Sequence, residues 1–446
     1  MPNIRIKTLT IKNYRTIADA QLDYSAGVIG LIGVNASGKT NVSRASGLLC
    51  DLIKTSLPQI QRSRIANSEP EWPPLDKIEP SALLYDPTPD NELTVAATFS
   101  VPQHLIPREQ GKALKEIDFS LSQHLLSVSA TLRVANLPNG QVRFVPRYDV
   151  QLDGKPLTSN DIQHLNNLWV QFNAARLRAL RPATEFLDSM KKLRDKSVPG
   201  HNAFDKLNDH LLELDANFAR VSFVGNDPMG IEGGISDLSV DNMSSGNLRA
   251  LQLVSAAINP EMAGAVVLHL EEPETHFHPS LQRAVVRQVI ANCRDHNVPV
   301  SIETHSPEVL RELYVREVPV YRVEVIERHK SNSTRRSMVR SLPKGPEALR
   351  FLSSMGIEAG FSLLGGITII TDGPTDPPAY RQFLSLFPET RDELICFVPM
   401  GCLDAHGLDL SGLGQLSENS ILLADGHFKE EHGDQLQEKC REGVHP

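Results

Sequence analysis

The loop Gly33-Val34-Asn35-Ala36-Ser37-Gly38-Lys39-Thr40 constrains the fold of this chain more than any other feature. It fits the pattern G-x-x-x-x-G-K-[ST], follows the apolar run 26–32 and precedes a segment, 41–49, that can continue as a helix. Glycines let backbone N–H groups turn inward around phosphates, the lysine reaches the terminal phosphates, and the threonine hydroxyl can ligate Mg²⁺. The sequence therefore predicts a nucleotide-binding unit made of a strand, this phosphate loop and a helix. The residues expected at the nucleotide are Gly33, Asn35, Ser37, Gly38, Lys39, Thr40 and Asn41.

Length and composition indicate an ordinary soluble protein of several domains. A chain of 446 residues, with 40% hydrophobic and 22% charged residues, can bury a large core and form two or three domains. No stretch approaches the ~18 apolar residues of a membrane span, and residues 1–7 lack the apolar core of a signal peptide. We therefore expect a cytoplasmic protein without a membrane partner. The five cysteines lack metal-ligand spacing, and the net charge of −9 gives no general indication of nucleic-acid binding.

The pattern of the chain changes along its length. Residues 4–11 alternate as a half-buried strand does, and they lead into the phosphate loop. Residues 58–158 begin as a proline-rich loop and continue into strand-like runs at 93–99 and 126–132, which predicts a β-rich layer. Residues 159–225 predict a helical insertion. We expect one nucleotide-binding domain over 1–345 and a separate α/β segment over 365–446.

A serine–glycine turn begins a helical pattern in the second half of the first domain. The turn is Ser244-Ser245-Gly246, and the pattern follows at 248–254. A helix N-terminus with a free hydroxyl and backbone N–H groups suits the γ-phosphate of a nucleotide held by another subunit. The same residues are also typical of an ordinary helix start, so both interpretations stay open.

Two further strands end in groups that suit phosphate chemistry. The buried run 266–270 ends in Glu271 and Glu272, whose side chains point opposite ways in a strand. One carboxylate can support Mg²⁺ while the other orients or deprotonates the attacking water. The next strand, over 298–304, ends at His305, which can hydrogen-bond a γ-phosphate or cap the helix that follows.

Together these motifs resemble those of the ABC-type ATPases of the OLD (overcoming lysogenization defect) and AAA_21 types, found in bacterial anti-phage systems. The resemblance covers residues 1–345 and rests on Asn13-Tyr14-Arg15, the phosphate loop, the Ser244–Gly246 turn, the string 271–279 (EEPETHFHP) and Thr304-His305-Ser306-Pro307. It implies an α/β ABC-type P-loop NTPase core that uses ATP and Mg²⁺. By this resemblance Glu271 supports magnesium beside Thr40, Glu272 is catalytic, His305 is the switch residue, and Ser244, Ser245 and Gly246 form the signature turn. Glu271 departs from the family, which usually has Asp there.

The resemblance also implies how the chain assembles. ATPases of this type hydrolyse ATP in a composite site, for which one subunit gives the phosphate loop and the other the signature turn. A chain with one copy of each is expected to form a head-to-tail dimer or a higher homo-oligomer.

The C-terminal segment has acids after two strand-like runs, Asp372 and Asp376 after 366–370 and Asp425 after 421–424. These strand ends resemble those of a Toprim domain that lacks some of its acids. Toprim nucleases gather Mg²⁺ with a Glu after one strand and an Asp-x-Asp pair after a later one. Here Asp372 stands where the Glu is expected, Asp376 follows it, and Asp425 is followed by Gly426 and His427 rather than by a second Asp. We interpret the segment as a degenerate or truncated Toprim-like fold. The alternatives are an active nuclease and simple turn residues at strand ends.

Two local clusters of basic residues are candidates for contact with DNA or a phage-derived ligand. One holds Arg328, Lys330, Arg335, Arg336 and Arg340. The other consists of Arg176, Arg178, Arg181, Lys191, Lys192 and Arg194. Solvated loops and helix faces give the same pattern, so both interpretations remain.

These observations favour an ATPase whose nucleotide-driven association controls an effector, in anti-phage defence or DNA metabolism. The effector would be a separate nuclease or toxin, and the trigger DNA or a phage protein. A second hypothesis is an ATP-bound sensor scaffold with little turnover that cages such an effector. A third is an OLD-like, Mg²⁺-dependent DNA nuclease.

Overall fold

The computed structural model divides the chain into two compact units. The first comprises Met1–His305 and Val318–Ser341, and the second Ser306–Glu317 and Leu342–Pro446. Each unit is considered by itself below. The structure describes residues 3–59, 83–84, 92–107, 114–136, 142–177, 203–214, 220–224, 227–232, 235–239, 243–256, 264–328, 335–342, 351, 367–371, 379–380, 382, 395–399 and 420–423.

The first unit is built on a large mixed sheet. Among the described residues it has twelve strands in the order β7-β6-β5-β4-β1-β2-β15-β14-β3-β13-β12-β8. Their bounds are β1 Arg5–Tyr14, β2 Ile17–Asp23, β3 Val28–Ile32, β4 Glu92–Pro102, β5 Gln123–Asn136, β6 Val142–Leu152, β7 Lys155–Pro156, β8 Ala174–Leu177, β12 Val267–Glu271, β13 Val300–Thr304, β14 Val320–Arg328 and β15 Arg335–Ser341.

One half of this sheet is parallel and contains the phosphate loop. Strands β14, β3, β13, β12 and β8 all pair in parallel. The loop joins β3, whose residues are all buried, to helix α1 (Lys39–Ser56). Parallel strands present their carboxyl ends at one edge, where open α/β sheets bind ligands. The ends of β3, β13 and β12 therefore lie side by side, and they carry the predicted site residues.

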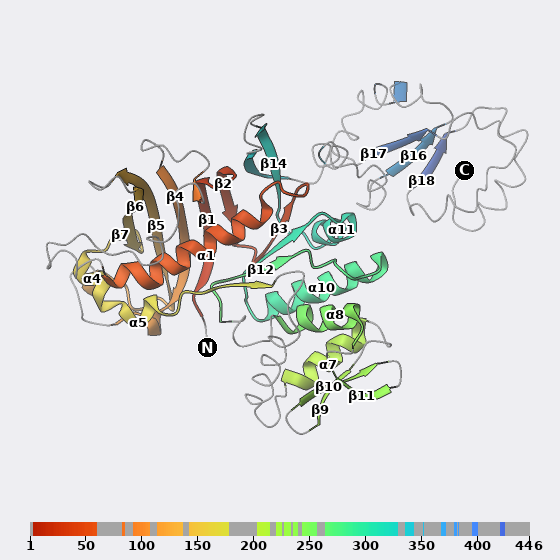
Figure 1. Ribbon diagram of the computed structural model, residues 1–446, viewed down its shortest axis with the longest axis horizontal. Helices are drawn as coiled ribbons and strands as arrows, with labels where there is room; N and C mark the ends of the chain where they lie inside the picture. Colours follow the sequence, from red (N-terminus) through yellow and green to blue (C-terminus); the bar gives the residue numbers. More distant parts are fainter. Residues whose placement is uncertain are drawn as a thin grey trace, which may run out of the picture. The chain divides into compact units, whose positions relative to one another are not determined.

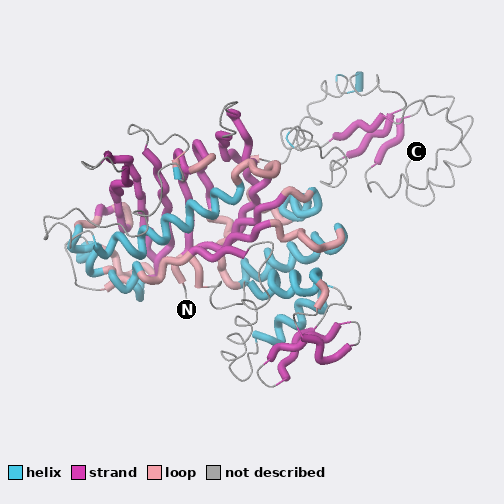
Figure 2. Tube along the Cα trace, in the orientation of Figure 1, coloured by secondary structure: helices cyan, strands magenta, loops and turns pink. Residues whose placement is uncertain are grey.

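The other half of the sheet is antiparallel and packs on helix α1. Strands β7, β6, β5, β4, β1 and β2 pair in antiparallel fashion. Figure 2 shows α1 running across the strands, and Figure 1 places it over β1 and β4. The Ile6 amide donates to Val266 O at 3.0 Å, and Arg5 Nη1 donates to Ala265 O at 2.7 Å. These bonds tie β1 to the segment before β12, so the two halves enclose α1.

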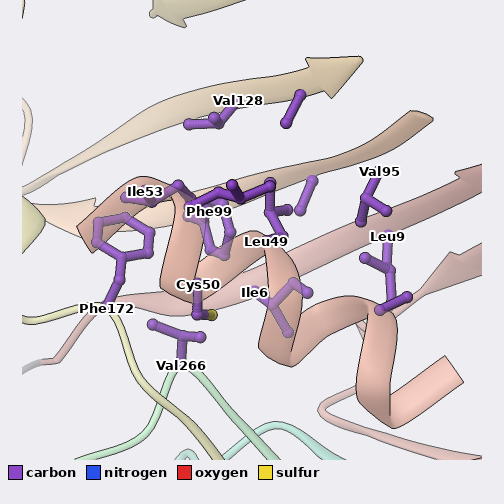
Figure 3. Packing of buried hydrophobic residues seen from close by; sticks show 14 of the residues in the cluster. Ile6, Leu9, Leu49, Cys50, Ile53, Val95, Phe99, Val128, Phe172 and Val266 are labelled. Atoms are coloured by element: carbon purple, nitrogen blue, oxygen red, sulfur yellow. The ribbon is translucent and has the colours of Figure 1, made fainter. Parts of the chain in front are cut away.

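The hydrophobic core of the first unit surrounds this helix. Leu49, Cys50 and Ile53 of α1 are buried against side chains of the antiparallel strands. Figure 3 shows Phe99 of β4 and Phe172 beside α1, and their rings meet edge to face with centroids 4.9 Å apart. Burial of such side chains stabilises the fold by about 1.5–3 kcal/mol each. The packing fixes α1, and with it the phosphate loop at its N-terminus.

Further helices and a small sheet complete the first unit. The sheet has the order β11-β10-β9, with β9 Arg220–Val224, β10 Asp227–Glu232 and β11 Ile235–Ser239. Helices α7 (Ala203–Leu214), α8 (Ser245–Ala256) and α10 (Pro279–Asp295) lie together. Short elements are the helices α4 (Ser159–His164) and α5 (Asn166–Trp169) and the 3-10 turns η1 (Leu57–Gln59), η2 (Gln103–Leu105) and η3 (Leu114–Glu116).

The described residues of the predicted helical insertion, 159–225, contain strands as well as helices. Helices α4, α5 and α7 lie in this range, but so do strands β8 and β9. Strand β8 is part of the parallel sheet, where it pairs with β12. It has only four residues, Ala-Ala-Arg-Leu, and they do not alternate between apolar and polar, so no strand pattern marks it in the sequence. The strands predicted at 4–11, 93–99 and 126–132 are confirmed as parts of β1, β4 and β5.

The second unit contains helix α11 (Pro307–Val315) and a three-stranded parallel sheet among its described residues. The sheet has the order β17-β16-β18, with β16 Ile367–Thr371, β17 Ile395–Pro399 and β18 Ser420–Leu423. Asp372, Asp376 and Asp425 lie outside the described residues. The Toprim-like assignment therefore stays a prediction. In the described part of the chain, no helix has the length and apolar character needed to cross a membrane.

Candidate functional site

The conformation and packing of the phosphate loop require glycine at two of its positions. Gly38 has φ 108° and stands as the N-cap of α1, and Ala36 has φ 60°. A Cβ at Gly38 would lie 2.5 Å from Thr16 Oγ1, and one at Gly33 would lie 2.6 Å from Ser37 Oγ and 2.6 Å from Val323 O. Both glycines are therefore needed, Gly38 for its left-handed conformation and Gly33 for the close approach of β14. Asn41, one residue beyond the loop, donates to Thr16 Oγ1 at 2.8 Å.

Lys39 lies folded into the loop. Its Nζ donates to Gly33 O at 2.7 Å and to Val34 O at 3.2 Å. Burial lowers the pKa of this amine, while the charges of Glu303, Glu272 and Glu274 act in the opposite direction. The lysine amine therefore bonds to the loop carbonyls and experiences the charges of three carboxylates.

Glu303 is a site residue that the sequence analysis missed. It lies in β13, is 1% exposed, and accepts a hydrogen bond from Thr40 Oγ1 at 3.1 Å. Burial and the charge of Glu271 raise its pKa to about 7, partly offset by the hydroxyl of Thr40, the charge of Arg176 and the hydroxyl of Ser43. The sequence does contain a signal for this residue, because Glu303 is a charged residue within the otherwise uncharged strand segment 300–304. A charged residue is rarely buried without a function or a partner.

Glu271, expected to support magnesium, lies at the end of β12 and has another partner. Its Oε1 accepts from Nε of Arg176 on β8, the neighbouring strand. Both side chains are mostly buried, with 16% and 20% of their surface exposed. Arg176 belonged to the second predicted basic cluster, and its ion pair with Glu271 removes it from a surface that could hold DNA. The other members of that cluster lie outside the described residues.

Glu272 and His305 come together beside a buried third residue, Glu274. Nδ1 of His305 lies 3.5 Å from Glu272 Oε1 and 3.7 Å from Glu274 Oε1. Glu272 has φ 43°, so the chain leaves β12 in a tight turn, which Thr275 Oγ1 closes by donating to Glu272 O at 2.8 Å. Glu274 is 5% exposed and accepts from Thr304 Oγ1 at 2.8 Å and from the His305 amide at 3.2 Å. The predicted catalytic pair is thus brought together by the ends of β12 and β13.

The predicted signature turn lies at the start of α8. Ser244 and Ser245 are exposed, and a Cβ at Gly246 would lie 3.3 Å from His276 O. One turn further along, Arg249 is 2% exposed and its Nη2 donates to Glu271 O at 2.8 Å and to Glu272 O at 3.4 Å. Burial lowers the pKa of Arg249 to about 10, so it stays charged at neutral pH. Helix α8 is therefore bonded directly to the backbone that carries both glutamates.

The first basic cluster lies partly on the hairpin of β14 and β15. Arg328 pairs with Arg335 across the two strands, and Glu327 with Arg336. Arg340 on β15 is exposed, and its Nε donates to Met338 Sδ at 3.0 Å. His329 and Lys330 lie outside the described residues. A contact of this cluster with DNA stays a prediction.

Comparison with known proteins supports an ATPase domain. A family described as "AAA domain, putative AbiEii toxin, Type IV TA system" matches residues 148–311, which include the signature turn, Glu271, Glu272 and His305. Among curated proteins, none matches the sequence. The phosphate loop lies outside the matched residues, so the loop and the match are two separate indications of a P-loop ATPase domain.

Distant similarity is also found among solved structures. The "SMC head domain from Thermotoga maritima" has 14% identity and a TM-score of 0.40, over 76% of this chain and 99% of that one. An Smc head bound to the C-winged helix domain of ScpA has 12% identity and a TM-score of 0.45, over 78% and 99%. An Smc head with an extended coiled coil, bound to the C-terminal domain of ScpA and derived from Pyrococcus furiosus, has 12% and 0.43, over 79% and 100%. The predicted α/β P-loop class is confirmed by the chain's own strand order and by the loop between β3 and α1.

Proposed function

We propose that this protein binds ATP with Mg²⁺ and hydrolyses it in a site completed by a second copy of the chain. The observation that carries this proposal is the meeting of three strand ends. β3 leads to Lys39, β12 to Glu272 and β13 to His305, with Glu272 and His305 3.5 Å apart. A phosphate-binding amine, a carboxylate and an imidazole at one sheet edge are the groups that phosphoryl transfer to water requires.

The residues present fit a nucleotide and its cation. Ser37 Oγ and Glu303 Oε1 are buried and have no hydrogen-bond partner among the described residues. Lys39 donates to its own loop carbonyls and can exchange these bonds for phosphate oxygens. Thr40 would hold the metal, supported by a carboxylate from a neighbouring strand. When bound, Mg²⁺ neutralises charge on the β- and γ-phosphate oxygens.

The chain's own residues supply the remaining chemistry. Glu272 is 36% exposed in its side chain, so it can reach a water molecule, orient it and accept its proton. His305, with 43% of its side chain exposed, is placed to donate to a γ-phosphate oxygen. Glu274 holds the His305 backbone, and Arg249 holds the carbonyls of both glutamates. The turn that carries Glu272 is thus fixed from two sides.

The exposure of the signature turn supports a composite site. Ser244 and Ser245 are exposed at the N-terminus of a 12-residue helix, where backbone N–H groups favour an anion. The chain has one phosphate loop and one such turn, so two copies arranged head to tail would complete two sites. We propose that this association controls an effector, a separate nuclease or toxin, in anti-phage defence or DNA metabolism. The similarity to a family described by a putative toxin supports that context.

ATP turnover measured across protein concentrations tests the proposal, with light scattering to report mass with and without ATP. Turnover per subunit is expected to rise with concentration, and to vanish in Lys39→Ala and Glu272→Gln. Lys54→Ala on the exposed face of α1 and Glu116→Gln, with 60% of its side chain exposed, are matched controls that retain turnover.

A large assembly that binds ATP but has negligible turnover in the wild type would overturn hydrolysis. It would favour a nucleotide-bound scaffold that cages a toxin or nuclease. Turnover independent of concentration would instead overturn the composite site.

A further inference from the structure

We propose that Glu303, rather than Glu271, is the carboxylate that shares the nucleotide's Mg²⁺ with Thr40. The inference rests on the proposed function, because it concerns the metal of the same ATP site. It places the metal-binding carboxylate on β13, whose sequence motif was assigned only to the switch residue His305.

Strand order places Glu303 nearer the phosphate loop. β13 pairs directly with β3, where Glu303 lies opposite Leu31, one residue before the last residue of β3. β12 pairs with β13, not with β3, and Glu271 lies opposite Glu303. Since paired strands are about 4.8 Å apart, Glu271 starts one strand spacing farther from the loop.

The contacts of the two carboxylates also favour Glu303 as the metal ligand. Glu303 Oε2 accepts from Thr40 Oγ1 at 3.1 Å, so one oxygen already touches the hydroxyl expected to ligate the metal. Its Oε1 is buried and has no hydrogen-bond partner among the described residues. Burying a carboxylate oxygen without a partner is unfavourable, and a cation beside Thr40 would supply the missing partner.

Glu271 is engaged elsewhere. Its carboxylate pairs with the Arg176 guanidinium on β8, on the side of β12 away from β13. To reach a metal at Thr40 it would have to leave a mostly buried cation unpaired.

The test is the dependence of nucleotide affinity on the metal. The affinity of a non-hydrolysable mant-ATP analogue is measured with excess Mg²⁺ and with EDTA, and the ratio reports the metal's contribution. Glu303→Gln is expected to lower this ratio on the order of 10- to 100-fold while the affinity in EDTA is retained. Glu271→Gln, the matched variant on β12, is expected to keep the wild-type ratio. Binding of Mn²⁺ to the nucleotide complex, followed by EPR, gives a second readout and should fail in Glu303→Gln alone.

Retained affinity in EDTA shows that the loop and its lysine remain folded. If Glu303→Gln does not fold, Glu303→Asp keeps the charge but withdraws it by one methylene, and an intermediate ratio is expected. If Glu271→Gln lowers the ratio of the affinity in Mg²⁺ to that in EDTA, the proposal is overturned, whatever the result for Glu303→Gln. A wild type that binds the analogue equally well with Mg²⁺ and EDTA would instead count against the proposed function itself.

Discussion

The ends of β12 and β13 look alike in sequence, yet they place their glutamates in different surroundings. Glu271 and Glu303 lie opposite each other in register, and each is the last or next-to-last residue of its strand. Glu271 is paired with Arg176 on the far side from the phosphate loop, whereas Glu303 is buried against Thr40. The comparison teaches that the contacts of a carboxylate follow from strand order, which the local motif does not specify.

The backbone differs between the two ends as well. After β12 the chain turns at Glu272 with φ 43° and again at His276 with φ 72°. The turn stays in place because Arg249 donates to the carbonyls at its start and Glu274 binds the end of β13. The end of β12 therefore depends on helix α8, while the carboxylate of β13 depends on α1 through Thr40.

The largest effect is expected from the link between α1 and β13. Thr40→Val keeps the shape of the side chain but removes the hydroxyl that contacts Glu303. The gain in nucleotide affinity from Mg²⁺ should fall on the order of 100-fold, whereas Thr40→Ser, which keeps the hydroxyl, should retain it. Isothermal titration calorimetry with and without Mg²⁺ measures both. If Mg²⁺ increases the nucleotide affinity equally in the wild type and in Thr40→Val, the contact between Thr40 and Glu303 has no part in metal binding.

The next effect concerns the arginines at the end of β12. Arg249→Met should lower the free energy of unfolding by about 2 kcal/mol, because two backbone carbonyls lose a charged donor. Turnover should fall as well, since Glu272 is no longer fixed. Arg176→Met should cost less, about 1 kcal/mol, because the 16% of the Glu271 side chain that is exposed lets water solvate part of the carboxylate left without its partner. Urea unfolding of both variants decides the ranking, and a larger loss in Arg176→Met would contradict it.

A smaller effect is expected from the bond that joins the two ends. Glu274→Gln, Thr304→Val and the double variant form a cycle across the 2.8 Å bond between these side chains. A coupling of about 1.5 kcal/mol is expected because the bond is buried and the acceptor is charged. The control cycle is Thr94 with Thr131, a partly buried pair on neighbouring strands 3.2 Å apart, with an expected coupling of about 0.5 kcal/mol. Equal couplings would mean that the two strand ends are held independently.

The sequence predicts the parts of the site that have local patterns. The phosphate loop, the strands over 266–270 and 298–304 and the helix start at Ser245 are all found where periodicity and turn residues indicate. These features can be predicted because each is dictated by a few neighbouring residues. Glycine conformations and the alternation of apolar residues do not depend on the rest of the fold.

The pairing of the carboxylates could not be predicted in this way. Arg176 precedes Glu271 by 95 residues, and it reaches Glu271 only because the four-residue strand β8 adds to the sheet beside β12. Glu303 contacts Thr40, 263 residues away, because β13 lies between β3 and β12. Strand order is a tertiary property, so the sequence motif alone favours Glu271 as the metal carboxylate.

The smallest effect is a pH-dependent change in folding stability that involves His269. This residue is buried in β12, between α1 and β13. Its Nε2 lies 2.6 Å from Ser46 Oγ of α1, and its Nδ1 lies 2.5 Å from Ser301 Oγ of β13. Burial, together with the charge of Arg176, lowers the pKa of His269 from 6.5 to about 3. The imidazole is therefore neutral in the folded protein at pH values where the unfolded chain binds a proton.

Because the unfolded state binds more protons below pH 6.5, folding stability from this group is lost as the pH falls through that value, and the loss continues down to about pH 3. Between about pH 7 and pH 5.5 the wild type should lose about 1 kcal/mol more than His269→Gln, whose amide can still bond to both serines but does not titrate. Urea unfolding at the two pH values gives the loss of folding stability for each protein. Subtracting one loss from the other cancels the contribution of the carboxylates, which both proteins share. An equal loss in both would show that His269 is charged in the fold, and the packing of β12 between α1 and β13 would then need a different account.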